Sequence, residues 1–186
     1  MKKVTGFTLV ELVVVIVVLG LLAVAALPRF IDVTDNAKEA SIEAVAGGYA
    51  TAVLSARAQW EGNGRPVGGN ADRPLVDYDG QNFWLTTADT TYRDGYPYEI
   101  SDNSNNGFGT PTVDAARCVR LMDNLLQNPP SVGTSYTLGN DYVAKAQTGT
   151  TCRYYQDLAG TQAENTRNHY FDYDLTKGSV TVTLAN

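Results

Sequence analysis

The most unusual chemical group in this chain is a carboxylate within an apolar segment. Glu11 is the one charged residue between Leu9 and Leu27, where nearly every other residue is Val, Ile, Leu or Ala. An unpaired carboxylate in an apolar helix is costly, and acidic residues in membrane-spanning segments are usually functional. We therefore expect Glu11 to have a positively charged partner. The alternative is that its side chain reaches the lipid headgroup region.

The apolar run has the length and the flanking charges of a membrane-spanning helix. Phe7 to Leu27 would extend for about 31 Å as a helix, which matches the hydrocarbon core of a bilayer. Lys2 and Lys3 precede it, and positive charge stays on the cytoplasmic side. The prediction is a single-pass membrane segment with its N-terminus in the cytoplasm. A cleavable secretory signal cut after Ala25, a plain anchor, and a segment that later packs inside a protein assembly remain open.

Two cysteines lie in the part of the chain that this orientation exports. An oxidising compartment favours a disulfide between Cys118 and Cys152, and closing a loop of about 35 residues contributes about 3.8 kcal/mol in the chain-entropy model. Free thiols are the alternative. Three arginines close to these cysteines in sequence are expected to form local ion pairs or contacts with a neighbouring subunit: Arg117, Arg120 and Arg153.

A polar stretch in the middle of the chain begins as a calcium-binding loop does. Oxygen-bearing side chains stand at its first, third and fifth positions, at Asp102, Ser104 and Asn106. Gly107 follows, as such a loop requires, but Val113 occupies the twelfth position, where a glutamate is needed. A weak calcium site would therefore need a remote carboxylate, for which the candidates are Asp94, Glu99 and Asp114. The alternative is a polar turn, and the sequence predicts no other cofactor.

The composition argues against most enzymes and against nucleic-acid binding. The chain has 186 residues, one histidine, His169, and two cysteines, too few for most zinc sites or for a histidine-based catalytic centre. No nucleophile and base are suitably spaced, so we predict no enzyme activity. The net charge of −6 disfavours binding to phosphates. The length suits one globular body plus the apolar segment.

Beyond Pro28 the apolar residues recur at steps of three and four as far as Trp60. This is the pattern of an amphipathic helix packed on one face, and its members are Ile42, Val45, Tyr49, Val53, Ala56 and Trp60. Pro28 predicts a kink in the long helix, and Gly20 is a second weak point. Residues 61–110 are rich in turn-forming residues and are expected to form a long loop with one or two strands.

The second half of the chain predicts a short helix and an antiparallel sheet. The helix is expected over 112–126, and strands over 135–138, 142–147, 151–156, 169–173 and 179–184. The last two strands flank a turn and are expected to form a hairpin. The economical architecture is α+β: a long N-terminal helix packed on an antiparallel sheet of about four strands, with a second short helix.

The N-terminus resembles the class III signal of type IV pilins and pseudopilins. The residues that carry the resemblance are Gly6-Phe7-Thr8-Leu9-Val10-Glu11 followed by the apolar helix. In that family a prepilin peptidase removes the leader, which implies a cut between Gly6 and Phe7 and N-methylation of Phe7. The family also implies that Glu11 pairs with the N-terminal amine of a neighbouring subunit, and that the helix between Gly20 and Pro28 unwinds in filaments.

Scattered motifs in the rest of the chain are similar to type IVa pilins and minor pilins of the mannose-sensitive haemagglutinin (MSHA) pilus system. They are Ala50–Trp60, Gly64–Pro66, Cys118 with Leu125–Pro130, Cys152–Tyr155 and Tyr173–Val180. The resemblance implies a leader (1–6), a hydrophobic half-helix for the membrane or filament core (7–28), an amphipathic half-helix (29–60) and a globular head (61–186). Type IVa pilins have a C-terminal disulfide, which agrees with the two cysteines.

The resemblance implies a structural pilus subunit. Such a subunit waits in the inner membrane, is processed by prepilin peptidase, and is assembled by the pilus machinery with copies of itself or other pilins. The extracellular filament would serve attachment, and by resemblance motility or DNA uptake. One alternative is a type II secretion pseudopilin, although major pseudopilins are usually shorter and lack the cysteine pair. The other is a secreted or anchored enzyme cut after Ala25, which the missing catalytic set disfavours.

Overall fold

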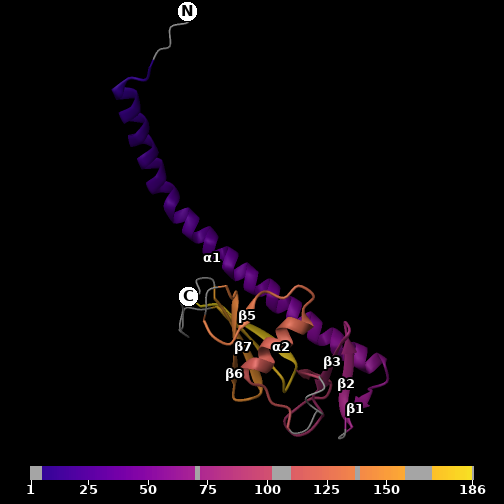
Figure 1. Cartoon of the computed structure of the whole chain (residues 1–186). Helices are drawn as coiled ribbons and strands as arrows, with labels where there is room; N and C mark the ends of the chain where they lie inside the picture. Colours follow the sequence, from indigo (N-terminus) through magenta and orange to yellow (C-terminus); the bar gives the residue numbers. More distant parts are fainter. Residues whose placement is uncertain (1–5, 70–71, 102–109, 137–138, 158–168, 186) are drawn as a thin grey trace, which may run out of the picture. The chain divides into compact units, whose positions relative to one another are not determined.

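A computed structural model describes residues 6–69, 72–101, 110–136, 139–157 and 169–185, and Figure 1 shows the order of their elements. The chain divides into two units, Met1–Ala40 and Ser41–Asn186. Helix α1 (Leu9–Gly62) supplies the helical part of the first unit and the first element of the second. The fold class is α+β, as the sequence predicts.

In the first unit, α1 exposes its apolar residues. Every Val, Leu and Ile between Leu9 and Leu27 is exposed, and Val24 reaches 75%. The 19 residues of this stretch are long and apolar enough to cross a membrane. An aqueous protein rarely leaves so large an apolar surface uncovered, so this surface is suited to lipid or to another protein.

In the second unit, one face of α1 is buried in the core. The buried residues recur at steps of three and four, as the sequence predicts, and they are Ile42, Ala46, Tyr49, Ala52, Val53, Ala56 and Trp60, whereas Val45 is only partly buried. Tyr49 lies at the centre, with its ring centroid 5.5 Å from that of Tyr154 and 5.4 Å from that of Tyr173. The periodic stripe therefore fixes which face of the helix meets the rest of the body.

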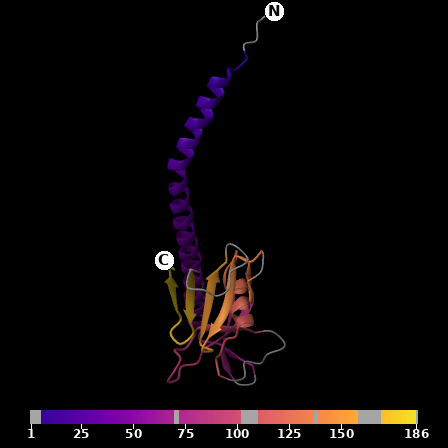
Figure 2. The same cartoon turned by 90° about the vertical axis from the view of Figure 1, so that its left-hand side faces the viewer.

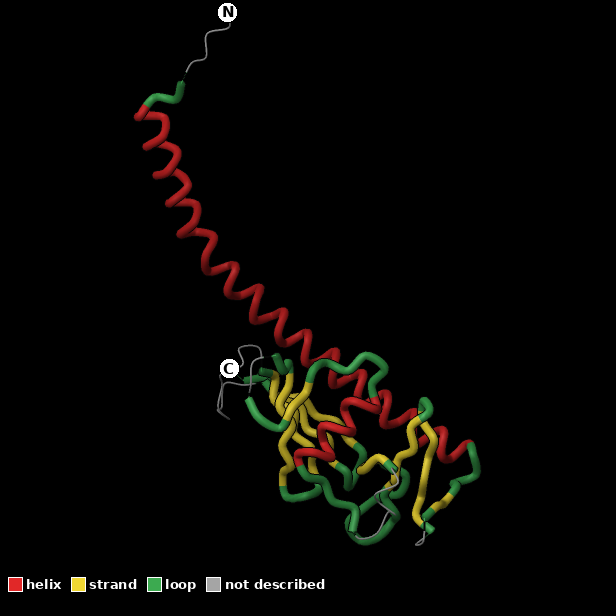
Figure 3. Tube along the Cα trace, in the orientation of Figure 1, coloured by secondary structure: helices red, strands yellow, loops and turns green. Residues whose placement is uncertain are grey.

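The larger sheet has five strands in the order β5-β6-β7-β8-β9. The strands are β5 (Val132–Gly133), β6 (Tyr142–Gln147), β7 (Thr151–Gln156), β8 (Tyr170–Asp174) and β9 (Ser179–Thr183). The four strands β6 to β9 are antiparallel, which confirms the expected sheet and its last hairpin. Figure 3 shows these strands and the helices by type.

The structure corrects the prediction of a strand over 135–138. Ser135 and Tyr136 are not in a strand, whereas residues 137–138 lie outside the described residues. Pairing occurs earlier, where β5 runs parallel to β6. The backbone N–H groups of Asp141 and Tyr142 both donate to the Ser131 carbonyl at 2.9 Å. The start of β6 therefore bonds to the residue just before β5.

A second sheet of four antiparallel strands replaces most of the long loop expected over 61–110. Its strands are β1 (Val67–Gly68), β2 (Arg73–Tyr78), β3 (Gln81–Leu85) and β4 (Pro97–Ile100). A tight turn with positive φ at Asp79 (54°) and Gly80 (81°) joins β2 to β3. An Asp-Gly pair between strands favours such a two-residue hairpin, so the prediction of one or two strands was too low.

Helix α2 (Ala115–Leu125) packs against strands of both sheets. It begins slightly later than expected because the Asp114 side chain caps it, accepting a hydrogen bond from Arg117 N–H at 2.8 Å. Its buried residues are Cys118, Leu121, Met122 and Leu125. Cys118 is bonded to Cys152 of β7 in a disulfide, so α2 is covalently joined to the larger sheet.

Candidate functional site

The carboxylate of Glu11 closes the first turn of its own helix. The backbone N–H and the hydroxyl of Thr8 both donate to Glu11 Oε2, at 2.9 and 2.8 Å, and Glu11 N–H donates back to the Thr8 hydroxyl at 3.3 Å. This reciprocal arrangement is a capping box, which satisfies N–H groups that a helix start leaves unpaired. Within the described residues the bonds go to Oε2, and Oε1 is left for a second partner.

The residues that precede the helix lie in irregular backbone. Gly6, Phe7 and Thr8 come before α1 begins at Leu9, and Met1–Thr5 lie outside the described residues. Phe7 is 84% exposed. A Cβ built on Gly6 would find no non-adjacent atom within 4 Å. The Gly6–Phe7 peptide bond is therefore outside the helix and uncovered by the described chain.

The helix is continuous across the two positions expected to weaken it. Both Gly20 and Pro28 lie within α1. A Cβ built on Gly20 would also find no atom within 4 Å, so packing within the described chain does not require glycine there. Unwinding between these positions in a filament stays a prediction.

The arginines near the disulfide are engaged within the chain. Glu99 of β4 is 4% exposed. It accepts a hydrogen bond from Arg120 at 2.5 Å and forms an ion pair with Arg117, and both arginines lie on α2. On β7, Arg153 makes a two-pronged ion pair with Asp172 at 2.8 and 2.9 Å. These are local ion pairs of the kind that the sequence predicts, and contacts of these arginines with a neighbouring subunit stay a prediction.

The proposed calcium loop lies outside the described residues, including Asp102, Ser104 and Asn106. The remote carboxylates that might complete it have other partners. Glu99 binds two arginines, Asp94 lies within 3.9 Å of Arg57, and Asp114 caps α2. Within the described residues there is no group of three or more His, Cys, Asp or Glu that could hold a metal ion.

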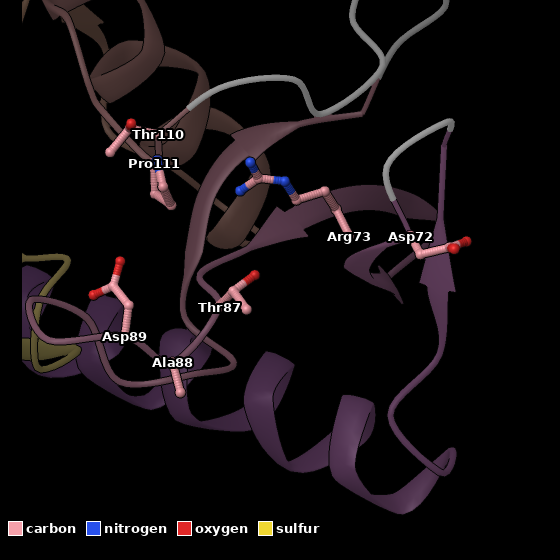
Figure 4. Close-up of a pocket in the computed structure, with 7 residues that line it drawn as sticks. All are labelled: Asp72, Arg73, Thr87, Ala88, Asp89, Thr110 and Pro111. Atoms are coloured by element: carbon pink, nitrogen blue, oxygen red, sulfur yellow. The ribbon is translucent and has the colours of Figure 1, made fainter.

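The one histidine of the chain contacts the backbone. His169 accepts a hydrogen bond from the Ala185 N–H through Nδ1 at 3.1 Å, which is a structural role. An open pocket of about 510 Å³ lies elsewhere in the body, and Figure 4 shows Arg73 extending across it toward Thr110 and Pro111. Asp89 in its wall accepts hydrogen bonds from the N–H groups of Thr91 and Tyr92.

Comparison with known proteins agrees with this N-terminal geometry. Residues 1–27 match the family model of the prokaryotic N-terminal methylation motif. The chain is also 46% identical over 57 residues to the type IV narrow pilus major component PilA5 of Thermus thermophilus. That similarity covers 31% of this chain and 49% of the relative, so the chain spans about half the length of the curated relative it matches. No solved structure matches.

These similarities and the fold support the type IV pilin family. The long apolar helix, followed by a short helix and an antiparallel sheet, is consistent with the type IV pilin fold. The MSHA-specific resemblance has no counterpart in the comparisons. The capping box is a feature that our sequence reasoning missed, although Thr8 and Glu11 have the spacing that signals it.

Proposed function

We propose that this chain is a structural, non-enzymatic subunit of a type IV pilus that polymerises through its N-terminal helix. The observation that carries the proposal is the N-terminal segment itself. Residues 1–27 match a methylation motif, and they include a single acidic residue in an otherwise apolar, exposed helix. A helix of this kind can first lie in lipid and later pack against identical helices in a filament.

Processing is proposed to take place between Gly6 and Phe7, followed by methylation of the new amine on Phe7. The irregular backbone supports this, because a peptidase must bind extended chain rather than helix. The uncovered position of Gly6 supports it as well. The partner in this step is prepilin peptidase, and the leader is residues 1–6.

Assembly is proposed to pair Glu11 with the Phe7 ammonium of a neighbouring subunit. Either charge alone in an apolar filament core would be strongly unfavourable, and together they neutralise each other. The capping box is compatible with this pairing, since Thr8 uses Oε2 and leaves Oε1 available. The same pair would fix the axial register between subunits.

The finer assignment follows the resemblance. Residues 7–28 would lie in the inner membrane with the N-terminus in the cytoplasm, and later in the filament core, where 20–28 would unwind. Residues 29–60 and 61–186 would form the amphipathic half-helix and the extracellular head. The pilus would be of the MSHA type, would contain this chain alone or with other pilins, and would serve surface attachment, with motility and DNA uptake as further roles.

Two variants test the processing and assembly steps separately. Gly6→Val should leave uncleaved precursor in the membrane, since the peptidase needs a small residue at the cut. Glu11→Val should be cleaved normally and yet be depleted in sheared filaments when produced beside the wild type. Immunoblots of membrane and filament fractions measure both.

Glu11→Gln separates charge pairing from helix capping. Glutamine keeps an acceptor for the Thr8 N–H but has no charge. The Glu11→Gln protein should therefore be depleted from filaments about as strongly as the Glu11→Val protein. If Glu11→Gln enters filaments at the wild-type level, then the carboxylate acts only as a helix cap and the proposed pairing is wrong.

A further inference from the structure

Strand β9 forms an open edge of the five-stranded sheet. It pairs with β8 on one side, and no strand of the described chain pairs with its other side. In Figure 2 it is the yellow strand next to the C-terminus, at the margin of the sheet. An edge strand presents a row of unpaired N–H and C=O groups, which can pair with a strand of another chain.

This edge lacks the features that usually prevent such pairing. Proteins protect edge strands with lysine, proline, bulges or very short length. Residues 178–185 contain no charged residue and no proline. The pairing with β8 is regular over five residue pairs. By contrast, the outer strands of the other sheet, β1 and β4, are only two and four residues long.

The residue pattern of β9 is symmetrical about Thr181. Ser179, Thr181 and Thr183 are exposed, and the two valines between them are partly buried on the opposite face. Val180 and Val182 pack against the core. Reversing the direction of the strand leaves this order of polar residue and valine unchanged.

We infer that β9 pairs antiparallel with β9 of a second copy of this chain, in a register centred on Thr181. In that register the two Thr181 residues face each other, Val180 faces Val182, and Ser179 faces Thr183. Cross-strand Thr–Thr and Thr–Ser hydrogen bonds are favourable. The chain carries a net charge of −6, and an uncharged edge is the place where two such copies can meet without repulsion.

A two-fold contact of this kind closes on itself and cannot build a helical filament. If the chain is the filament subunit proposed above, β9 would instead join subunits of two adjacent filaments. One pair of five-residue strands makes a small and weak contact. Many identical contacts along two filaments would act together and hold them side by side.

Cysteine substitutions test the register in the full-length chain in mild detergent, which requires no filament. Opposed residues of antiparallel strands have Cα atoms about 4.5–5.5 Å apart, within the range for a disulfide. The native cysteines are already bonded and buried. Under mild oxidation, Thr181→Cys should form covalent dimers. Ser179→Cys alone and Thr183→Cys alone should form at least fivefold fewer, while an equal mixture of the two should dimerise as Thr181→Cys does.

A blocking variant gives an independent outcome. Thr181 is exposed, so the fold should tolerate Thr181→Lys, but two such lysines would face each other across the two-fold axis. Added to the Ser179→Cys and Thr183→Cys mixture, it should abolish dimers, whereas Thr181→Val should keep them. An unchanged melting temperature confirms that both variants fold.

Three results would overturn the inference. The first is equal dimer formation by all three single cysteine variants, which would indicate random collision. The second is no dimer from Thr181→Cys. The third is cross-linking only to a protein of different mass, which would show that the edge accepts a foreign strand.

Discussion

Thr8 and Glu11 form a reciprocal pair at the start of α1, so the carboxylate that first suggested an intermolecular role also has an intramolecular one. Polar groups inside the body are also hydrogen-bonded to partners within the chain. The hydroxyl of Tyr49 lies 3.1 Å from that of Tyr154, which donates to the Cys118 carbonyl at 2.8 Å. Buried polar atoms need such partners, because an unpaired one costs about 1–3 kcal/mol.

The buried tyrosines predict that the body loses stability in alkaline solution. Burial raises the pKa of Tyr142 from 10.0 to about 12, and it also raises the pKa values of Tyr49, Tyr154 and Tyr173. Above pH 10 the unfolded chain loses these protons while the folded chain keeps them. The free energy of unfolding should therefore be independent of these groups below about pH 9 and fall above pH 10, by about 1.4 kcal/mol per pH unit for each tyrosine.

Denaturant titrations between pH 8 and pH 12 measure this dependence. Tyr142→Phe is the matched control, because it removes one titrating group and should make the decline less steep. A free energy of unfolding that stays flat up to pH 11.5 would contradict the prediction.

Breaking the ion pairs of Glu99 with Arg117 and Arg120 should lower the free energy of unfolding more than breaking an exposed ion pair does. Breaking a buried pair costs about 3–5 kcal/mol, but the side chains of Arg117 and Arg120 are 34% and 40% exposed. Allowing for solvent screening, we expect Glu99→Ala to lower the free energy of unfolding by about 2–3 kcal/mol. Asp172→Ala, which breaks the less buried pair with Arg153, should cost about 1 kcal/mol. Equal costs in denaturant unfolding would show that burial of Glu99 does not matter.

At the scale of elements, α2 joins the two sheets of the body. Glu99 links it to β4 of the smaller sheet, and the disulfide from Cys118 links it to β7 of the larger sheet. The hairpin of β8 and β9 adds a further link, since Arg93 N–H donates to the Thr176 carbonyl at 3.0 Å. A Cβ on Gly178, where φ is +68°, would lie 2.0 Å from the Tyr96 ring, so this turn requires glycine.

Removing the disulfide should destabilise the body without changing its fold. The bridge closes a loop across a sequence separation of 34 residues, for which the chain-entropy model gives about 3.8 kcal/mol. The variant Cys118→Ala/Cys152→Ala should lose about 2–4 kcal/mol and keep its far-ultraviolet circular dichroism. Reducing the wild type should have a similar effect, and a loss under 1 kcal/mol would contradict the account.

Some elements could be predicted from the sequence because local patterns determine them. The stripe from Ile42 to Trp60 gave the packed face of α1, and alternation around a glycine-containing turn gave β8 and β9. The smaller sheet was largely missed because its strands are short and interrupted by Asp, Asn and Pro. The contact of Glu99 with α2 joins residues about twenty positions apart, and no local pattern encodes such a contact.

At the scale of the whole molecule, the two units have opposite surface chemistry. The first exposes the apolar residues of α1, whereas the second packs most of its described large apolar residues into or against one core. The exposed helix needs lipid or other helices around it, and the folded body does not. This difference between an exposed apolar helix and a folded body, together with the methylation motif, is the basis for the proposed filament subunit.

The most direct test of the account is the chemical identity of the first residue of the extracellular protein. Mass spectrometry of the N-terminal peptide from sheared filaments should find a chain that begins at Phe7 and carries a methyl group on its amine. An intact Met1 would indicate a plain membrane anchor, and a chain beginning at Ala26 would indicate an ordinary secreted protein. Either of these results would contradict the account.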